Sequence, residues 1–135
     1  MRALICDDDR ISRFIVRKIL ERLGVEEIAE AVDGTDALKA LSANRFDLAM
    51  IDLHMPFLDG FDVVKAVRSR RSMDGMRVII MTADSREQVV REALSLGVSG
   101  YLLKPLKPDV AFVRISDALR PPAANSAPPN PAVRM

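Results

Sequence analysis

The stretch LAMIDLHMPFLDG, residues 48–60, joins an apolar run to a single acid and then to a loop. Residues 48–51 have the length and composition of a strand that is buried on both faces, and this run stops at Asp52. A turn signal already stands further along the loop, at Asp59 and Gly60, so the turn does not need the earlier acid. The pattern therefore indicates a functional carboxylate at the carboxyl end of a buried strand.

Similar apolar runs lie at 3–6, 78–81 and 101–103, and a weaker run at 27–32 holds two glutamates, which favours an edge strand. Each run is followed by an amphipathic segment. The first of these amphipathic segments has its apolar positions at Ile11, Phe14, Ile15, Ile19 and Leu23. Five alternating strand and helix units with short connections predict an α/β fold, an open doubly wound parallel sheet with right-handed crossovers.

Composition predicts one domain, residues 1–120, and a disordered tail rich in proline and alanine, residues 121–135. The net charge of +1 gives no field for nucleic acid or for an anionic membrane surface. No apolar run reaches membrane-spanning length, and the three acids at 7–9 come too early for a secretory signal. Cys6 is the only cysteine, so a disulfide framework is excluded and a cytoplasmic protein is expected.

Chemically active side chains stand where the strands end, and parallel sheets bind ligands at that edge. These residues are Asp7 and Asp8 after the first strand, Asp52 after the third, Thr82 after the fourth and Lys104 after the fifth. Carboxylates on neighbouring strands repel one another unless a cation lies between them, and Mg²⁺ accepts such oxygen ligands. A carboxylate, a metal, a lysine and a hydroxyl together suit phosphoryl transfer. We expect the next acid, Asp9, to be a helix N-cap.

Four motifs, CDDD, MIDLHMPFLDG, MTA and GYLLKP, agree in order and spacing with one family. Over residues 1–119 the chain resembles the receiver domains of two-component response regulators. The resemblance implies a flavodoxin-like sheet of order 2-1-3-4-5. It also implies that Asp52 accepts the phosphoryl group and that the phosphoryl oxygens are bound by Thr82 and Lys104. The implied Mg²⁺ ligands are Asp7, Asp8, Asp52 and the main-chain carbonyl of His54. The implied switch residues are Thr82 and Tyr101, and the Lys104–Pro105 peptide is implied to be cis.

By this resemblance the protein is a single-domain response regulator, phosphorylated by a histidine kinase or a histidine phosphotransfer protein. It is expected to catalyse only its own phosphorylation and dephosphorylation, and to act as a monomer or a phosphorylation-dependent dimer. Movement of Thr82 toward the phosphoryl group is expected to vacate space into which Tyr101 rotates. The rearranged face, residues 85–96, 99–103 and 110–119, would contact a downstream protein. The side chain of His54 is expected to point outward, where it and Asp84 affect the lifetime of the phosphoryl group.

Three alternatives stay open at this point. A haloacid-dehalogenase-type phosphatase also uses Asp, Mg²⁺, Thr and Lys, but it needs a second Asp where this chain has His54. A flavodoxin-like redox module would need a hydroxyl-rich phosphate loop, and three acids stand there instead. A receiver cut from a larger regulator or hybrid kinase is the third; the initial Met1 and the prolines after Leu119 favour a free-standing protein.

Overall fold

A computed structural model describes residues 1–120, and the predicted tail, residues 121–135, lies outside the described residues. The strands are β1 (Arg2–Cys6), β2 (Glu27–Ala31), β3 (Leu48–Asp52), β4 (Arg77–Thr82) and β5 (Gly100–Leu103). The α-helices are α1 (Arg10–Arg22), α2 (Gly34–Ala43), α3 (Gly60–Arg68), α4 (Glu87–Ser95) and α5 (Pro108–Leu119). All strand pairs are parallel and the order is β2-β1-β3-β4-β5, so the predicted fold is confirmed, with β2 at an edge.

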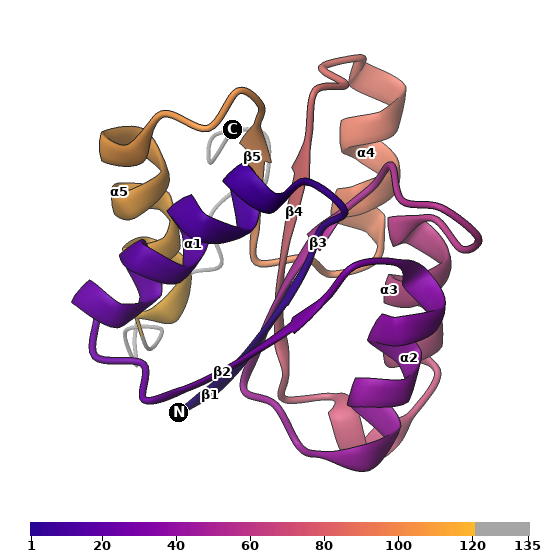
Figure 1. The fold of residues 1–135 in the computed structure, drawn as a ribbon. Helices are drawn as coiled ribbons and strands as arrows, with labels where there is room; N and C mark the ends of the chain where they lie inside the picture. Colours follow the sequence, from indigo (N-terminus) through magenta and orange to yellow (C-terminus); the bar gives the residue numbers. More distant parts are fainter. Residues whose placement is uncertain (121–135) are drawn as a thin grey trace, which may run out of the picture.

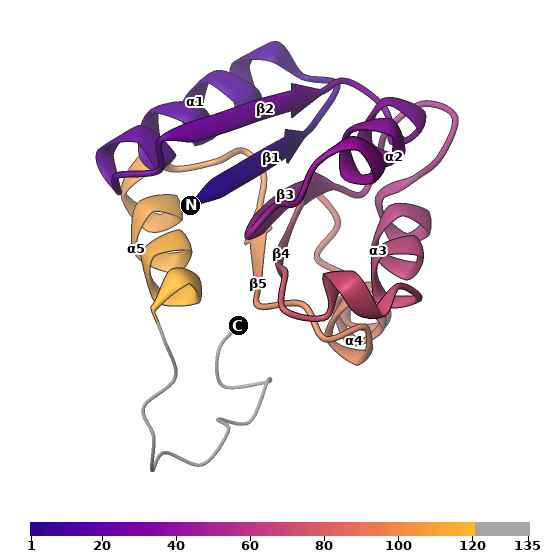
Figure 2. The ribbon, with the colours of Figure 1, turned by 90° about the horizontal axis from the view of Figure 1, so that it is seen from below.

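The sheet is covered on both sides, by α1 and α5 on one face and by α2, α3 and α4 on the other (Figures 1 and 2). Alternate residues of one strand enter the two layers. In β1, Ala3 and Ile5 pack with the α1 and α5 layer, whereas Leu4 and Cys6 pack with the opposite layer. All four are fully buried. This two-sided burial explains why the strands have continuous apolar runs rather than alternating ones.

Aspartate side chains cap the first three helices. Asp9 accepts from the amide of Ile11, as expected, and Asp33 and Asp59 cap α2 and α3. The Asp59-Gly60 pair that we expected to form a turn is therefore an N-cap followed by the first helical residue, and Asp33-Gly34 has the same arrangement. A Cβ atom at Gly60 would lie 2.4 Å from the carbonyl oxygen of Asp52. Only glycine allows α3 to begin so close to the end of β3.

Two features differ from expectation on the surface of the domain. Ile11 and Phe14 were expected in the core, but they are 70% and 60% exposed, because they lie three residues apart on the outer side of α1. The core side of this helix instead includes Ser12, Val16 and Leu20. A short 3₁₀ turn, Arg71–Met73, follows α3 and was not predicted. Within the described residues, no helix has the length and apolar character to cross a membrane.

Candidate functional site

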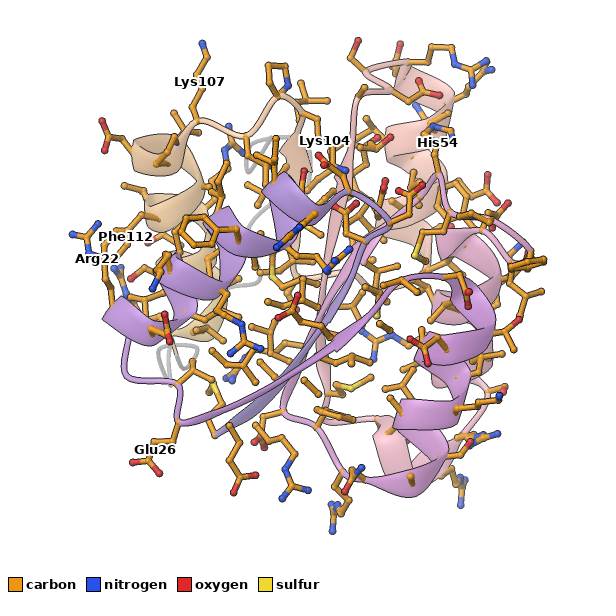
Figure 3. The ribbon with its side chains drawn as sticks, viewed as in Figure 1. Arg22, Glu26, His54, Lys104, Lys107 and Phe112 are labelled. Carbon is orange, nitrogen blue, oxygen red and sulfur yellow. The ribbon has the colours of Figure 1, made fainter. Side chains whose placement is uncertain are left out.

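Lys104 bridges two carboxylates at the carboxyl edge of the sheet. Its Nζ lies 2.8 Å from Oδ2 of Asp7 and 3.1 Å from Oδ2 of Asp52. Asp7 follows β1 and Asp52 ends β3, while Lys104 follows β5 and donates its backbone amide to the carbonyl of Thr82. The Lys104–Pro105 peptide is cis, as the resemblance implied. Figure 3 shows Lys104 at the same end of the sheet as His54.

Asp7 is a fully buried acid. Its Oδ1 accepts from the backbone amide of Asp9 at 2.8 Å, but the geometry at Oδ2 gives that oxygen no hydrogen bond despite the nearby lysine. Burial raises the pKa of Asp7 above its usual value and the charge of Asp52 raises it further, although Lys104 and the Asp9 amide oppose these effects. Burial lowers the pKa of Lys104, but its contacts with Asp7 and Asp52 outweigh burial, so that its pKa stands above the usual value.

The acidic cluster suits a hard cation. One carboxylate oxygen from each of Asp7, Asp8 and Asp52 lies within 4.8 Å of the other two, and Asp8 is exposed to solvent. The buried Oδ2 of Asp7 has an ion-pair contact with Lys104 but no hydrogen bond, so it can still offer a lone pair to a cation. Oxygen ligands with an open, solvent-facing side are what Mg²⁺ takes in proteins. These residues therefore fit the metal that the sequence predicted.

The loop after β3 holds Asp52 from one side. The backbone amide of His54 donates to Oδ1 of Asp52 at 3.1 Å, and the amide of Gly60 donates to the carbonyl of Leu53 at 2.9 Å. The His54 residue is exposed. Asp52 thus has one oxygen bound by the loop backbone and the other bound by Lys104, and the residue is 3% exposed.

Thr82 and Tyr101 are linked through the backbone of Asp84. The amide of Asp84 donates to Oγ1 of Thr82 at 3.1 Å, and the hydroxyl of Tyr101 donates to the carbonyl of Asp84 at 2.6 Å. The N-cap of α4 is Arg86, so Thr82 does not cap that helix. The Tyr101 residue is 4% exposed in this structure. Its rotation on phosphorylation stays a prediction.

Two arginines near the site were missed by the sequence analysis. Arg86 pairs with Asp84, and this contact holds the pKa of Asp84 down at about 2. Arg13, in α1, donates to the backbone carbonyl of Asp7 at 2.8 Å and to Glu30 of β2 at 2.8 Å. The sequence did indicate a role for Arg13, because the predicted edge strand holds a glutamate without an assigned role and the predicted helix before it holds two arginines four residues apart.

Comparison with known proteins agrees with this geometry. Residues 3–116 match the family model described as the response regulator receiver domain. The chain belongs to the response regulator receiver domain family. It is 37% identical over 115 residues to the chemotaxis protein CheY of Pseudomonas aeruginosa, which covers 85% of this chain and 93% of that protein.

Two solved structures support the same family. The chemotaxis response regulator CheY4 of Vibrio cholerae is similar with a TM-score of 0.79 and 30% identity, over 87% of this chain and 98% of that one. The Francisella response regulator 1452 receiver domain is similar with a TM-score of 0.74 and 33% identity, over 87% and 94% of the two chains. Membership in this family rules out the phosphatase and flavodoxin-like alternatives. The third alternative, a receiver domain from a larger regulator, stays open.

Proposed function

We propose that the protein is a phosphorelay switch whose Asp52 accepts a phosphoryl group from a histidine kinase or a histidine phosphotransfer protein. The observation that supports this most directly is the position of Lys104, whose Nζ lies within 3.1 Å of carboxylate oxygens on both Asp7 and Asp52. A lysine that only paired with surface acids would not need to reach two buried carboxylates on neighbouring strands. The same lysine can bind an oxygen of a phosphoryl group attached to Asp52.

The transfer needs one new bond and one broken bond. A carboxylate oxygen of Asp52 attacks phosphorus, and the bond from phosphorus to the donor imidazole nitrogen breaks. Lys104 and the hydroxyl of Thr82 are placed to bind the peripheral phosphoryl oxygens. Asp7, Asp8, Asp52 and the carbonyl of His54 would hold Mg²⁺, which supplies positive charge to those oxygens. We propose that the protein catalyses only its own phosphorylation and dephosphorylation.

The donor must reach Asp52 over the edge of the sheet, and α1 begins at this edge. Ile11 and Phe14 form an exposed apolar pair on that helix. Such a pair suits contact with a protein better than contact with water. We propose that the donor protein rests on this end of α1 while its phosphohistidine reaches the site.

Output is proposed to use the face of α4, β5 and α5. A groove of about 740 Å³ runs between these elements, and Tyr101 lines it. Apolar Val90, Leu94 and Leu106 line its walls, and the basic side chains of Arg91 and Lys107 also line it. A downstream protein, or a second copy of the chain, would bind here after phosphorylation. The relatives named for chemotaxis support a role in chemotaxis, and the cytoplasm is the proposed compartment.

Phosphopeptide mapping tests the assignment of Asp52. The protein is incubated with a small phosphodonor and Mg²⁺, the acyl phosphate is trapped chemically, and the labelled residue is identified by mass spectrometry. We expect label on Asp52, and none in Asp52→Asn. Asp59→Asn is the matched control, because asparagine can still cap α3 and the acid lies in the same loop. Label that persists in Asp52→Asn would refute the proposal.

A further inference from the structure

Arg13 is bound between an edge-strand acid and the backbone of the site. Its Nη1 donates to the carbonyl oxygen of Asp7 at 2.8 Å, and its Nε donates to Oε1 of Glu30 at 2.8 Å. The arginine side chain is only 16% exposed. Glu30 is held in turn by Arg17, whose Nε donates to Oε2 at 2.8 Å. The Arg13 guanidinium is therefore held by Glu30 on its Nε side while Nη1 donates to the carbonyl of Asp7.

That carbonyl belongs to the peptide unit between Asp7 and Asp8. The unit is planar, so holding its oxygen also holds the amide of Asp8 and the two Cα atoms from which the side chains of Asp7 and Asp8 leave the backbone. The carboxylate of Asp7 is further held by the Asp9 amide. Asp8 is exposed to solvent, so the placement of its Cα atom by this peptide plane is what brings its carboxylate beside that of Asp7.

We propose that Arg13 is a positioning residue for the metal site, which holds the Asp7–Asp8 peptide so that both carboxylates face the same cation. This inference rests on the proposed function, because it presumes that these acids bind Mg²⁺. Arg13 does not touch the metal or the phosphoryl group; it acts through the backbone carbonyl of Asp7. Partners that orient metal ligands typically change metal affinity by about 10- to 100-fold when they are removed.

Arg17 provides a matched control on the same helix. Arg17 carries the same charge and binds the same Glu30. Its backbone contact, however, is with the carbonyl of Ile28 at 3.2 Å and not with a residue of the acidic site. Removing either positive charge beside an acidic site should, by electrostatics alone, leave Mg²⁺ binding unchanged or slightly tighter. A loss of affinity that is confined to the Arg13 variant therefore cannot come from charge.

The test is a titration with MgCl₂ followed by amide chemical shifts in NMR, on the wild-type protein, Arg13→Met and Arg17→Met. We expect the Kd for Mg²⁺ to rise about tenfold in Arg13→Met and to stay within about twofold in Arg17→Met. Thermal unfolding without metal should give similar midpoints for the two variants, since each loses one contact to Glu30 and one to a carbonyl. Arg13→Lys, which keeps the charge but not the planar fork, should fall between wild type and Arg13→Met.

The outcomes distinguish failure of the proposed metal site from failure of the proposed role of Arg13. Wild-type protein that binds no Mg²⁺ would refute the proposed metal site, and the role of Arg13 with it. Wild-type binding combined with equal affinities in Arg13→Met and Arg17→Met would overturn only the role of Arg13. If Arg13→Met does not fold, Arg13→Lys decides the question: lowered affinity in that variant would support the role of the guanidinium, and wild-type affinity would overturn it.

Discussion

The backbone of Asp84 joins Thr82 to Tyr101 by two hydrogen bonds, one accepted by the Thr82 hydroxyl and one donated by the Tyr101 hydroxyl. The two proposed switch residues are thus in contact through one residue of the loop between β4 and α4. A phosphoryl group would accept a hydrogen bond from the Thr82 hydroxyl, and movement of that hydroxyl toward the phosphoryl group would strain the bond that Oγ1 accepts from the Asp84 amide. Any shift of Asp84 then changes the acceptor that holds Tyr101, so the relay can carry a change from the site to the groove.

The first prediction is that the two hydrogen bonds are energetically coupled. Tyr101→Phe keeps the buried ring and removes one bond, for an expected cost of about 1 kcal/mol in the free energy of unfolding. Thr82→Val keeps the side-chain shape and removes the other. Denaturant unfolding of both single variants and the double variant should give a coupling energy of about 0.5 kcal/mol or more. Strictly additive effects would mean that no relay connects Thr82 to Tyr101.

The second prediction concerns the alkaline titration of Tyr101. Burial raises the pKa of its hydroxyl to about 12, with a further contribution from the charge of Asp84. A raised pKa in the folded state means that the neutral hydroxyl stabilises the fold below pH ~10, its pKa in unfolded chains, and that this stability is lost as the pH rises toward 12. The chain has one tyrosine and no tryptophan, so tyrosinate absorbance reports this residue alone. Titration with the pKa of a free tyrosine would contradict the buried, bonded position.

The third prediction is that Asp7→Asn stabilises the protein in metal-free solution at neutral pH. The pKa of Asp7 is raised by burial and by Asp52, so its contribution to stability is present below the unfolded pKa and is lost as the pH rises through the folded pKa. Asparagine mimics the protonated form. We expect a gain of about 1 kcal/mol at neutral pH, which disappears in acid. Mg²⁺ should stabilise the wild type but not the variant, as seen by thermal unfolding with and without metal.

Asp9→Asn is the control for this prediction, because it lies two residues away and its pKa is shifted in the opposite direction. Hydrogen bonds from the Ser12 hydroxyl and the Ile11 amide lower the pKa of Asp9. Its stabilising effect is therefore present at neutral pH and is lost as the pH falls through the folded pKa. Asp9→Asn should not stabilise the protein at neutral pH. Equal stabilisation by both variants would show that total acidic charge, and not the burial of Asp7, is responsible.

The fold and the acidic site were predictable because they follow from patterns along the chain. Continuous apolar runs fixed the number and burial of strands, and the topology rule for parallel sheets brought Asp7, Asp52 and Lys104 to one edge. The hydrophobic period of α1 could not show which apolar side chains the neighbouring elements leave uncovered, so the exposure of Ile11 and Phe14 was missed. The contact of Arg13 with a backbone carbonyl was missed for a related reason, because carbonyl acceptors have no sequence signature.

The last prediction concerns Phe57, which lies in the loop beside the site and has a left-handed backbone with φ of 71°. A bulky residue in this conformation is strained, and the side chain is 86% exposed, so packing does not compensate. Asparagine tolerates left-handed backbone better than phenylalanine does. We expect Phe57→Asn to raise the free energy of unfolding by about 0.5–1 kcal/mol in denaturant unfolding. Phe14→Asn, at an exposed position within α1, should instead destabilise the protein slightly, because asparagine is a poor helix former. Stabilisation by both variants would point to the loss of exposed apolar surface rather than to relief of strain at Phe57.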